Sequence, residues 1–315
     1  MKNRRSFIIG LSTHHLLLKE KKFLKKYKPW GVILFSRNIS SINQTKKLTN
    51  DVRKIFNDNK YPILIDQEGG RVSRIEKFID TSTFTGDFFG KIYKKNNKHF
   101  KIYYKVFNNQ ISLILKEIGI NINTVPVLDL RRNKFNDIVG DRSFGSDPKI
   151  VSKIGDYCIE LLHNNNIGAV IKHIPGHGLT NIDSHISTPI VRKDIKRLLK
   201  EDFYPFKNKK SLFAMTAHII YQNIDKINTA THSKKIIKII REKIKFKNII
   251  ISDDISMKSL KFSIEKNTEK AFTAGCNLVL HCNGKYNEMI SVANKSPKLS
   301  NFLIKKTSQF YKIIG

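Results

Sequence analysis

Short apolar segments recur along the chain, and longer segments of mixed polarity separate them. The short segments are rich in Ile, Val and Leu, and their length of five to seven residues is typical of buried strands. Eight segments have this character, at 6–11, 31–35, 61–66, 122–128, 168–173, 212–218, 248–253 and 277–282. Regular alternation of such strands with helices predicts a parallel sheet built from β-α units.

The intervening segments carry apolar residues at the spacing of an amphipathic helix. The clearest of them are 16–27, 41–56, 100–119, 148–165, 233–246 and 263–275. A doubly wound open sheet usually has fewer strands and a glycine-rich phosphate-binding loop near its start, and this sequence has no such loop. Eight strands match a closed barrel, so we predict an α/β fold, a single (β/α)8 barrel of the TIM type.

No linker rich in Pro, Gly or Ser divides the chain, so we expect one barrel domain over residues 1–315. The apolar run 6–11 lacks a small-residue cleavage site, and we interpret it as the first strand rather than a signal sequence. No stretch approaches the roughly 20 apolar residues that span a bilayer. The cysteines, Cys158, Cys276 and Cys282, are odd in number and have no metal-type spacing. We expect a cytoplasmic protein without membrane insertion.

The formal net charge of +32 raises the question of an anionic partner. Lysines cluster at 19–26, 91–101, 193–210 and 234–247, in segments that we expect to be outer helices. Neither interleaved aromatic residues nor a known nucleic-acid motif accompanies them. We interpret the charge as a solvated surface, with steering of an acidic substrate as the alternative. We expect a monomer with no nucleic-acid partner.

Polar residues directly follow several of the predicted strands. Because parallel barrel strands all end at one rim, side chains at those ends meet in one pocket. The residues concerned are Asp66, Lys172, His173, Thr216, His218, Ser252, Asp253 and Asp254. Arg71, Arg74 and Arg142 add hydrogen-bond donors. Such a pocket suits sugar hydroxyls and an acetamido group, and it would keep an aspartate ionised as a nucleophile.

The long connection after the fifth strand contains Asp183 and His185, two residues apart. A carboxylate bonded to one imidazole nitrogen would leave the other for proton transfer, although a local turn hydrogen bond explains the same spacing. Together with His173, His177 and His218, His185 also raises the hypothesis of a zinc site. The spacings match no metal-binding motif and neighbouring Lys and Arg residues would repel a cation, so we expect no metal and no cofactor.

Six motifs occur in order along the chain: IDQEGGRVSR, GDRSFGSDP, KHIPGHG, IDSH, MTAH and IISDDISM. With them the chain resembles the bacterial β-N-acetylhexosaminidases of glycoside hydrolase family 3, and the resemblance extends over essentially the whole chain. It implies a retaining, exo-acting hydrolase that removes terminal N-acetylglucosamine. The typical substrates are the GlcNAc-anhydro-muramyl peptides of peptidoglycan recycling in the cytoplasm.

The resemblance also implies residue roles. Asp253 would be the nucleophile, and His185 would be the acid/base, oriented by Asp183. The sugar-binding residues would be Asp66, Arg74, Arg142, Lys172 and His173. We expect Asp254 to make a structural hydrogen bond, because adjacent strand residues point to opposite sides, and we expect Gly69 and Gly70 to form a tight turn.

Three positions depart from the family pattern. Asn248 stands where a Gly is usual, and Asn277 stands where an Asp is usual; we expect both to alter packing only. Leu179 replaces a common Asp in the catalytic loop, where it bears on the conformation of that loop.

Other functions remain open at this point. A β-glucosidase or a glycoside phosphorylase could use the same barrel. A glycan-binding or nucleic-acid-binding protein without activity is a further alternative, although binding alone has no use for Asp253, Asp183 and His185 together.

Overall fold

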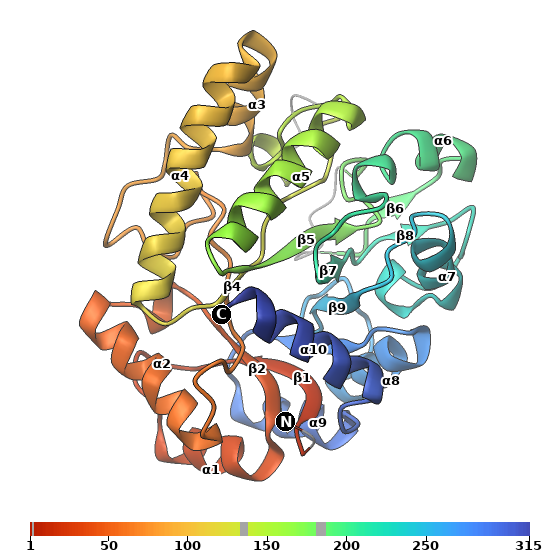
Figure 1. Ribbon diagram of the computed structural model, residues 1–315. Coiled ribbons are helices and arrows are strands. Elements are labelled where there is room, and N and C mark those ends of the chain that lie inside the picture. The colour runs from red at the N-terminus through yellow and green to blue at the C-terminus, as the bar shows by residue number, and fades with distance from the viewer. Residues whose placement is uncertain (2, 133–137, 181–186) are drawn as a thin grey trace.

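The computed structural model describes residues 1, 3–132, 138–180 and 187–315. Within these residues, eight parallel strands close into a barrel in the order β1-β10-β9-β7-β5-β4-β3-β2 (Figure 1). The strands are β1 (Arg5–Gly10), β2 (Pro29–Leu34), β3 (Ile63–Ile65), β4 (Ile122–Asn123), β5 (Gly168–Ile174), β7 (Phe213–Thr216), β9 (Ile249–Asp254) and β10 (Leu278–His281). Each lies within or beside a predicted segment, so the predicted (β/α)8 barrel is confirmed.

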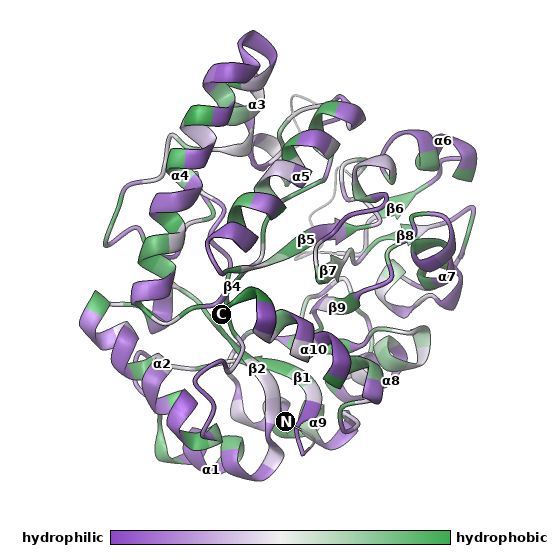
Figure 2. Cartoon of the chain, in the orientation of Figure 1, coloured by the Kyte–Doolittle hydropathy of each residue, from purple (hydrophilic) through white to green (hydrophobic). Residues whose placement is uncertain are grey.

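Helices surround the barrel, and in Figure 2 hydrophilic residues alternate with hydrophobic ones along them. They are α1 (Leu18–Tyr27), α2 (Ile42–Phe56), α3 (Gly86–Lys95), α4 (Asn97–Glu117), α5 (Pro148–Asn164), α6 (Ile195–Lys200), α7 (Lys234–Glu242), α8 (Ile264–Ala274), α9 (Tyr286–Lys295) and α10 (Asn301–Ile313). Four of those described, α3, α6, α9 and α10, were absent from the sequence prediction. No helix in the described part of the chain is long and apolar enough to cross a membrane.

Side chains alternate between two apolar layers along each strand. On β1, for example, Phe7 and Ile9 join the cluster between strands and helices, whereas Ile8 joins the cluster inside the barrel. The inner cluster includes Ile33, Leu64, Ile122, Val170, Ile251 and Leu280. This two-residue period fixes which side chains of a strand can reach the barrel mouth.

Helix α10 contributes to the inner cluster at the end of the barrel where the strands begin. Its Phe310 is fully buried, with its ring centroid 5.5 Å from that of Phe213. The indole of Trp30 donates a 2.9 Å hydrogen bond to the hydroxyl of Thr307. The barrel interior is therefore packed with side chains at this end, and the polar strand ends lie at the opposite rim.

The connection between β5 and β7 is long, as the sequence predicted. In its described part lie a two-residue strand, β6 (Ile190–Val191), and helix α6. Strand β6 pairs in parallel with β8 (Ile220–Tyr221), outside the barrel. The segment thus returns beside the barrel rim before β7 begins.

Candidate active site

Seven of the described barrel strands each place one residue above the inner apolar layer, two positions after the last apolar member of that layer. These residues are Gly10, Phe35, Asp66, Thr124, Lys172, Asp253 and Cys282. We call them the pocket floor. Their position follows directly from the two-residue strand period, and it brings charged groups from β3, β5 and β9 together at one rim.

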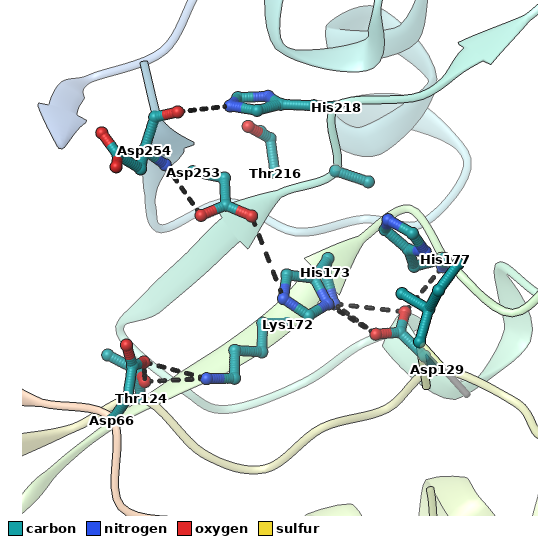
Figure 3. Close-up of polar contacts among 12 residues, drawn as sticks. Asp66, Thr124, Asp129, Lys172, His173, His177, Thr216, His218, Asp253 and Asp254 are labelled. Carbon is teal, nitrogen blue, oxygen red and sulfur yellow. Dashed lines mark hydrogen bonds and ion pairs between the residues drawn. The ribbon is translucent and has the colours of Figure 1, made fainter. Parts of the chain in front are cut away.

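Lys172 is the central cation of the pocket floor. Its ammonium lies 3.0 Å from Asp66 Oδ1 and 2.7 Å from Glu68 Oε1, and it donates a 3.0 Å hydrogen bond to the Thr124 hydroxyl. The Thr124 hydroxyl in turn donates to Asp66. Figure 3 shows Asp66, Thr124 and Lys172 at one side of the site. The Lys172 side chain is only 3% exposed, so two carboxylates compensate one buried charge.

Arg142 binds Glu68 through two parallel hydrogen bonds. Its Nε and Nη2 each donate over 2.8 Å to one carboxylate oxygen. Glu68 follows β3 at a turn in which Gly69 and Gly70 have φ of 98° and 58°, so the predicted tight turn is confirmed. Arg142 therefore reaches the pocket through Glu68, with its guanidinium already paired.

The charges of this group reinforce one another. Burial alone would raise the carboxyl pKa values, but Lys172 and Arg74 hold the pKa of Asp66 below its ordinary value. Arg142 and Lys172 do the same for the pKa of Glu68. Burial opposes the charged form of Lys172 as well, yet Asp66 and Glu68 raise its pKa. These shifts favour the ionised forms of Asp66, Glu68 and Lys172.

His173 lies between two carboxylates, as Figure 3 shows. Its Nδ1 is 2.6 Å from Asp129 Oδ2, and its Nε2 is 4.0 Å from Asp253 Oδ2. Asp129 is fully buried and also accepts hydrogen bonds from the backbone N–H groups of His173 and His177. Asp129 thus fixes the imidazole so that one nitrogen faces Asp253.

Asp253 is the penultimate residue of β9, and its side chain is 18% exposed. Burial would raise the pKa of its carboxyl, but His173 and the 2.7 Å hydrogen bond from the backbone N–H of Asp254 act against burial, and that pKa is lowered. The neighbouring Asp254 instead accepts from the hydroxyl of Ser256 at 2.8 Å and from the backbone N–H of Cys282 at 3.2 Å. The structural role predicted for Asp254 is confirmed, and Asp253 is left as the ionised group at the mouth.

His218 supports the end of β9 from the side of β7. Its Nε2 lies 3.0 Å from the carbonyl oxygen of Asp254, and its Nδ1 lies 2.7 Å from the hydroxyl of Thr231. Because the carbonyl can only accept, Nε2 carries the proton and Nδ1 accepts from the threonine. Burial lowers the pKa of His218, which favours this neutral tautomer. His218 is therefore engaged in holding the strand end.

A model of the glycosyl hydrolase family 3 N-terminal domain matches residues 12–308. The chain belongs to this family. A β-hexosaminidase of Hydrogenovibrio crunogenus is 32% identical over 258 residues, which are 80% of this chain and 71% of that protein. The resemblance drawn from the six motifs is thereby confirmed.

Solved structures agree with this assignment to family 3. NagZ from Neisseria gonorrhoeae in complex with a zinc ion has a TM-score of 0.85 and 26% identity, covering 99% of this chain and 90% of that chain. The same protein in complex with N-trifluoroacetyl-D-glucosamine has a TM-score of 0.83 and covers 99% of this chain and 96% of that chain. The family 3 chain described here is a glycoside hydrolase.

Two predicted residues of the hydrolase, Asp183 and His185, lie outside the described residues. Arg74 lies at the mouth, with its guanidinium carbon 5.6 Å from the centre of the Phe35 ring. Its Nε is buried and has no hydrogen-bond partner among the described residues. Arg74 thus differs from Arg142, whose guanidinium is bound to a carboxylate.

The described residues contain no group of three or more His, Cys, Asp or Glu side chains arranged to hold a metal ion. His173 and His218 are occupied by Asp129 and by Thr231 with the Asp254 carbonyl. Burial lowers the pKa of His177 to about 4, so it is neutral at neutral pH. These histidines serve hydrogen bonds in the described structure.

Sequence reasoning missed two residues of this family 3 site, Glu68 and Asp129. Glu68 lies inside the motif IDQEGGRVSR, where its position after strand β3 could have marked it. Asp129 lies in an apolar run after β4, and its 0% exposure gives no sign of function in the sequence. The departures Asn248 and Asn277 make hydrogen bonds at the opposite end of β9.

Proposed function

We propose that this family 3 hydrolase is a retaining, exo-acting β-N-acetylhexosaminidase. It releases terminal N-acetylglucosamine from peptidoglycan fragments, the GlcNAc-anhydroMurNAc peptides, in the cytoplasm. The observation that carries the proposal is an ionised Asp253 at the barrel mouth, 4.0 Å from an imidazole nitrogen of His173 and on the same floor as the Asp66–Lys172 pair. The relative named β-hexosaminidase and the neighbour solved with N-trifluoroacetyl-D-glucosamine support the choice of sugar.

In the proposed mechanism Asp253 attacks the anomeric carbon and forms a covalent glycosyl-enzyme. The carboxylate is suited to this step because it is deprotonated at neutral pH and partly exposed. Asp129 keeps His173 in place beside it, since the 2.6 Å contact at Nδ1 directs Nε2 toward Asp253. Water then hydrolyses the intermediate with retention of configuration.

We propose that His185, oriented by Asp183, protonates the leaving oxygen and later activates water. This assignment rests on the family motif alone. It replaces the usual second carboxylate of a retaining glycosidase by an imidazole. The Leu179 substitution belongs to the same loop.

The proposed sugar-binding set is Asp66, Arg74, Arg142, Lys172 and His173. Asp66 and Lys172 present a charged acceptor and a charged donor side by side, which suits adjacent sugar hydroxyls. The Nε of Arg74 is a donor without a protein acceptor in the described structure. Arg142 acts indirectly. It binds Glu68, and Glu68 in turn binds Lys172 and fixes the position of its ammonium group.

The test uses Asp253→Asn with an aryl β-N-acetylglucosaminide. We expect turnover to fall by at least about a thousandfold, since the amide cannot form the glycosyl-enzyme, with thermal unfolding unchanged. The exposed Asp80→Asn is the matched control and should retain full activity. Turnover by Asp253→Asn near the wild-type rate would refute the assignment of the nucleophile.

A second set of experiments tests the acid/base role of His185 and the choice of substrate. His185→Ala should slow natural glycans far more than aryl substrates, whose leaving groups need little protonation. Equal losses would argue against the acid role. Preference for the matching β-glucoside, or formation of N-acetylglucosamine 1-phosphate in phosphate buffer, would reassign the enzyme as a glucosidase or a phosphorylase.

A further inference from the structure

The pocket floor is divided into a charged part and an uncharged part. Asp66, Lys172 and Asp253 carry the charges, on β3, β5 and β9. Cys282, Gly10 and Phe35 come from β10, β1 and β2, which are neighbours in the barrel. We call these three residues the uncharged arc. Cys282 follows β10, the strand that pairs with β9, and it lies two residues beyond Leu280, which is opposite Asp254.

The side chain of Cys282 points into the barrel mouth. Leu278 and Leu280 belong to the inner cluster and Cys282 packs on it, whereas His281 turns outward and contacts Glu288 at 2.9 Å. The negative charges that act on the Cys282 thiol are those of Asp254, Asp66 and Asp253. The thiol therefore lies within electrostatic range of these carboxylates and continues the inward-facing positions Leu278 and Leu280 of β10.

The backbone holds Cys282 in this position from both sides. Its N–H donates to Asp254 over 3.2 Å, and its carbonyl oxygen accepts from the guanidinium of Arg37. A Cβ on Gly10 would lie 2.2 Å from that carbonyl oxygen, so β1 contributes only backbone here. The arc between β10 and β2 is thus lined by two side chains, those of Cys282 and Phe35.

We propose that Cys282 is a specificity-determining residue: its small, uncharged side chain forms the wall beside Asp253, and its size decides which sugars reach the nucleophile. The inference rests on the proposed role of Asp253. In the proposed binding mode, the glycosyl group on Asp253 extends past the end of β9 toward residue 282, two residues beyond Leu280, which is opposite Asp254. A bulkier side chain there would displace the sugar from the carboxylate, and a shift of about 1 Å lowers turnover by about a hundredfold.

Cys282 can be modified selectively, because the other two cysteines are buried. All three lie within the described residues, and Cys158 and Cys276 are 1% and 5% exposed, whereas Cys282 is partly exposed. Burial raises the pKa of both buried thiols to about 12. A small thiol reagent should therefore modify Cys282 selectively. Burial and the nearby carboxylates raise the pKa of Cys282 as well, so modification should accelerate with pH.

The experiment treats the full chain with methyl methanethiosulfonate. The Cys282 thiolate attacks the sulfenyl sulfur, a mixed disulfide carrying a methylthio group forms, and methanesulfinate leaves. Hydrolysis of the aryl β-N-acetylglucosaminide should fall by about a hundredfold, and dithiothreitol should restore it by reducing the mixed disulfide. N-acetylglucosamine should slow the modification, which mass spectrometry of the Cys282 peptide follows.

Two variants of Cys282 distinguish an effect of side-chain size in the pocket from a general loss of structure. Cys282→Ser should keep activity within a few-fold and resist the reagent, whereas Cys282→Leu should lose about a hundredfold in kcat/KM with thermal unfolding unchanged. Unmodified Cys282, full activity after modification, or modification that the sugar does not slow would each overturn the proposal. The protection of Cys282 by N-acetylglucosamine is measured by mass spectrometry and does not depend on turnover. It therefore tests whether Cys282 lies beside the bound sugar even if the enzyme does not cleave the aryl substrate.

Discussion

Glu68 neutralises two buried cations, since Lys172 and Arg142 both bind it and its side chain is 6% exposed. Glu68→Gln would keep the shape but remove the charge, leaving Lys172 and Arg142 with Asp66 as the remaining close carboxylate partner of this group. We expect the free energy of unfolding to fall by about 3–5 kcal/mol, as when one partner of a buried ion pair is removed. Urea titration measures the change. The exposed Glu76→Gln is the control, with an expected change below about 0.5 kcal/mol.

The lowered pKa of Glu68 also predicts how the free energy of unfolding depends on pH. Its pKa is lowered in the folded protein, so the folded state resists protonation where the unfolded chain, with a glutamate pKa of about 4.3, begins to bind protons. The contribution of Glu68 to the free energy of unfolding is complete above the pKa of the unfolded chain. It is lost as the pH falls through the lower pKa that Glu68 has in the folded protein. The stability difference between wild type and Glu68→Gln should shrink below about pH 4. A difference that grows on acidification would contradict this account.

Some residues of the site could be predicted from the sequence and others could not. Asp66, Lys172, His173 and Asp253 directly end predicted strands, and barrel geometry alone brings such residues to one rim. Their partner Asp129 could not be found in this way, because its role depends on a backbone path after β4 that brings it 2.6 Å from His173.

At the level of elements, α3 packs on the backbone that carries Arg142. A Cβ on Gly90 would lie 1.9 Å from the carbonyl oxygen of Phe144, and one on Gly86 would lie 2.2 Å from that of Arg142. Gly90→Ala should therefore lower the free energy of unfolding by about 1–3 kcal/mol, although Ala favours a helix by about 1 kcal/mol over Gly. Chemical denaturation measures this change in the free energy of unfolding. Lys95→Ala, exposed on the same helix, should have little effect, and a stabilised Gly90→Ala would refute the close packing.

These glycines also explain why the sequence analysis missed α3. Gly86 and Gly90 lower helix propensity, yet they are the residues that allow the helix to approach 142–144. Helix α6 has only six residues, too few for a periodic pattern. The strands were predictable because each is a continuous buried run, whereas a short helix depends on the surface that it covers.

For the molecule as a whole, α10 completes the interior. Phe310 is fully buried against Trp30 and Phe213, whereas Phe302 on the same helix is 37% exposed. Phe310→Ala should cost about 3–5 kcal/mol of unfolding free energy, and Phe302→Ala should cost under about 0.5 kcal/mol. Thermal unfolding of the two variants compares them directly. Similar losses would mean that α10 does not close the barrel.

The place of α10 has a consequence for biosynthesis. Residues 301–313 leave the ribosome after every barrel strand, yet their side chains fill the end of the barrel where those strands begin. A nascent chain that has all eight strands still lacks part of its core and keeps an apolar opening beside Trp30. Packing of residues 301–313 against Trp30 and Phe213 thus completes the apolar interior that the eight strands alone leave open.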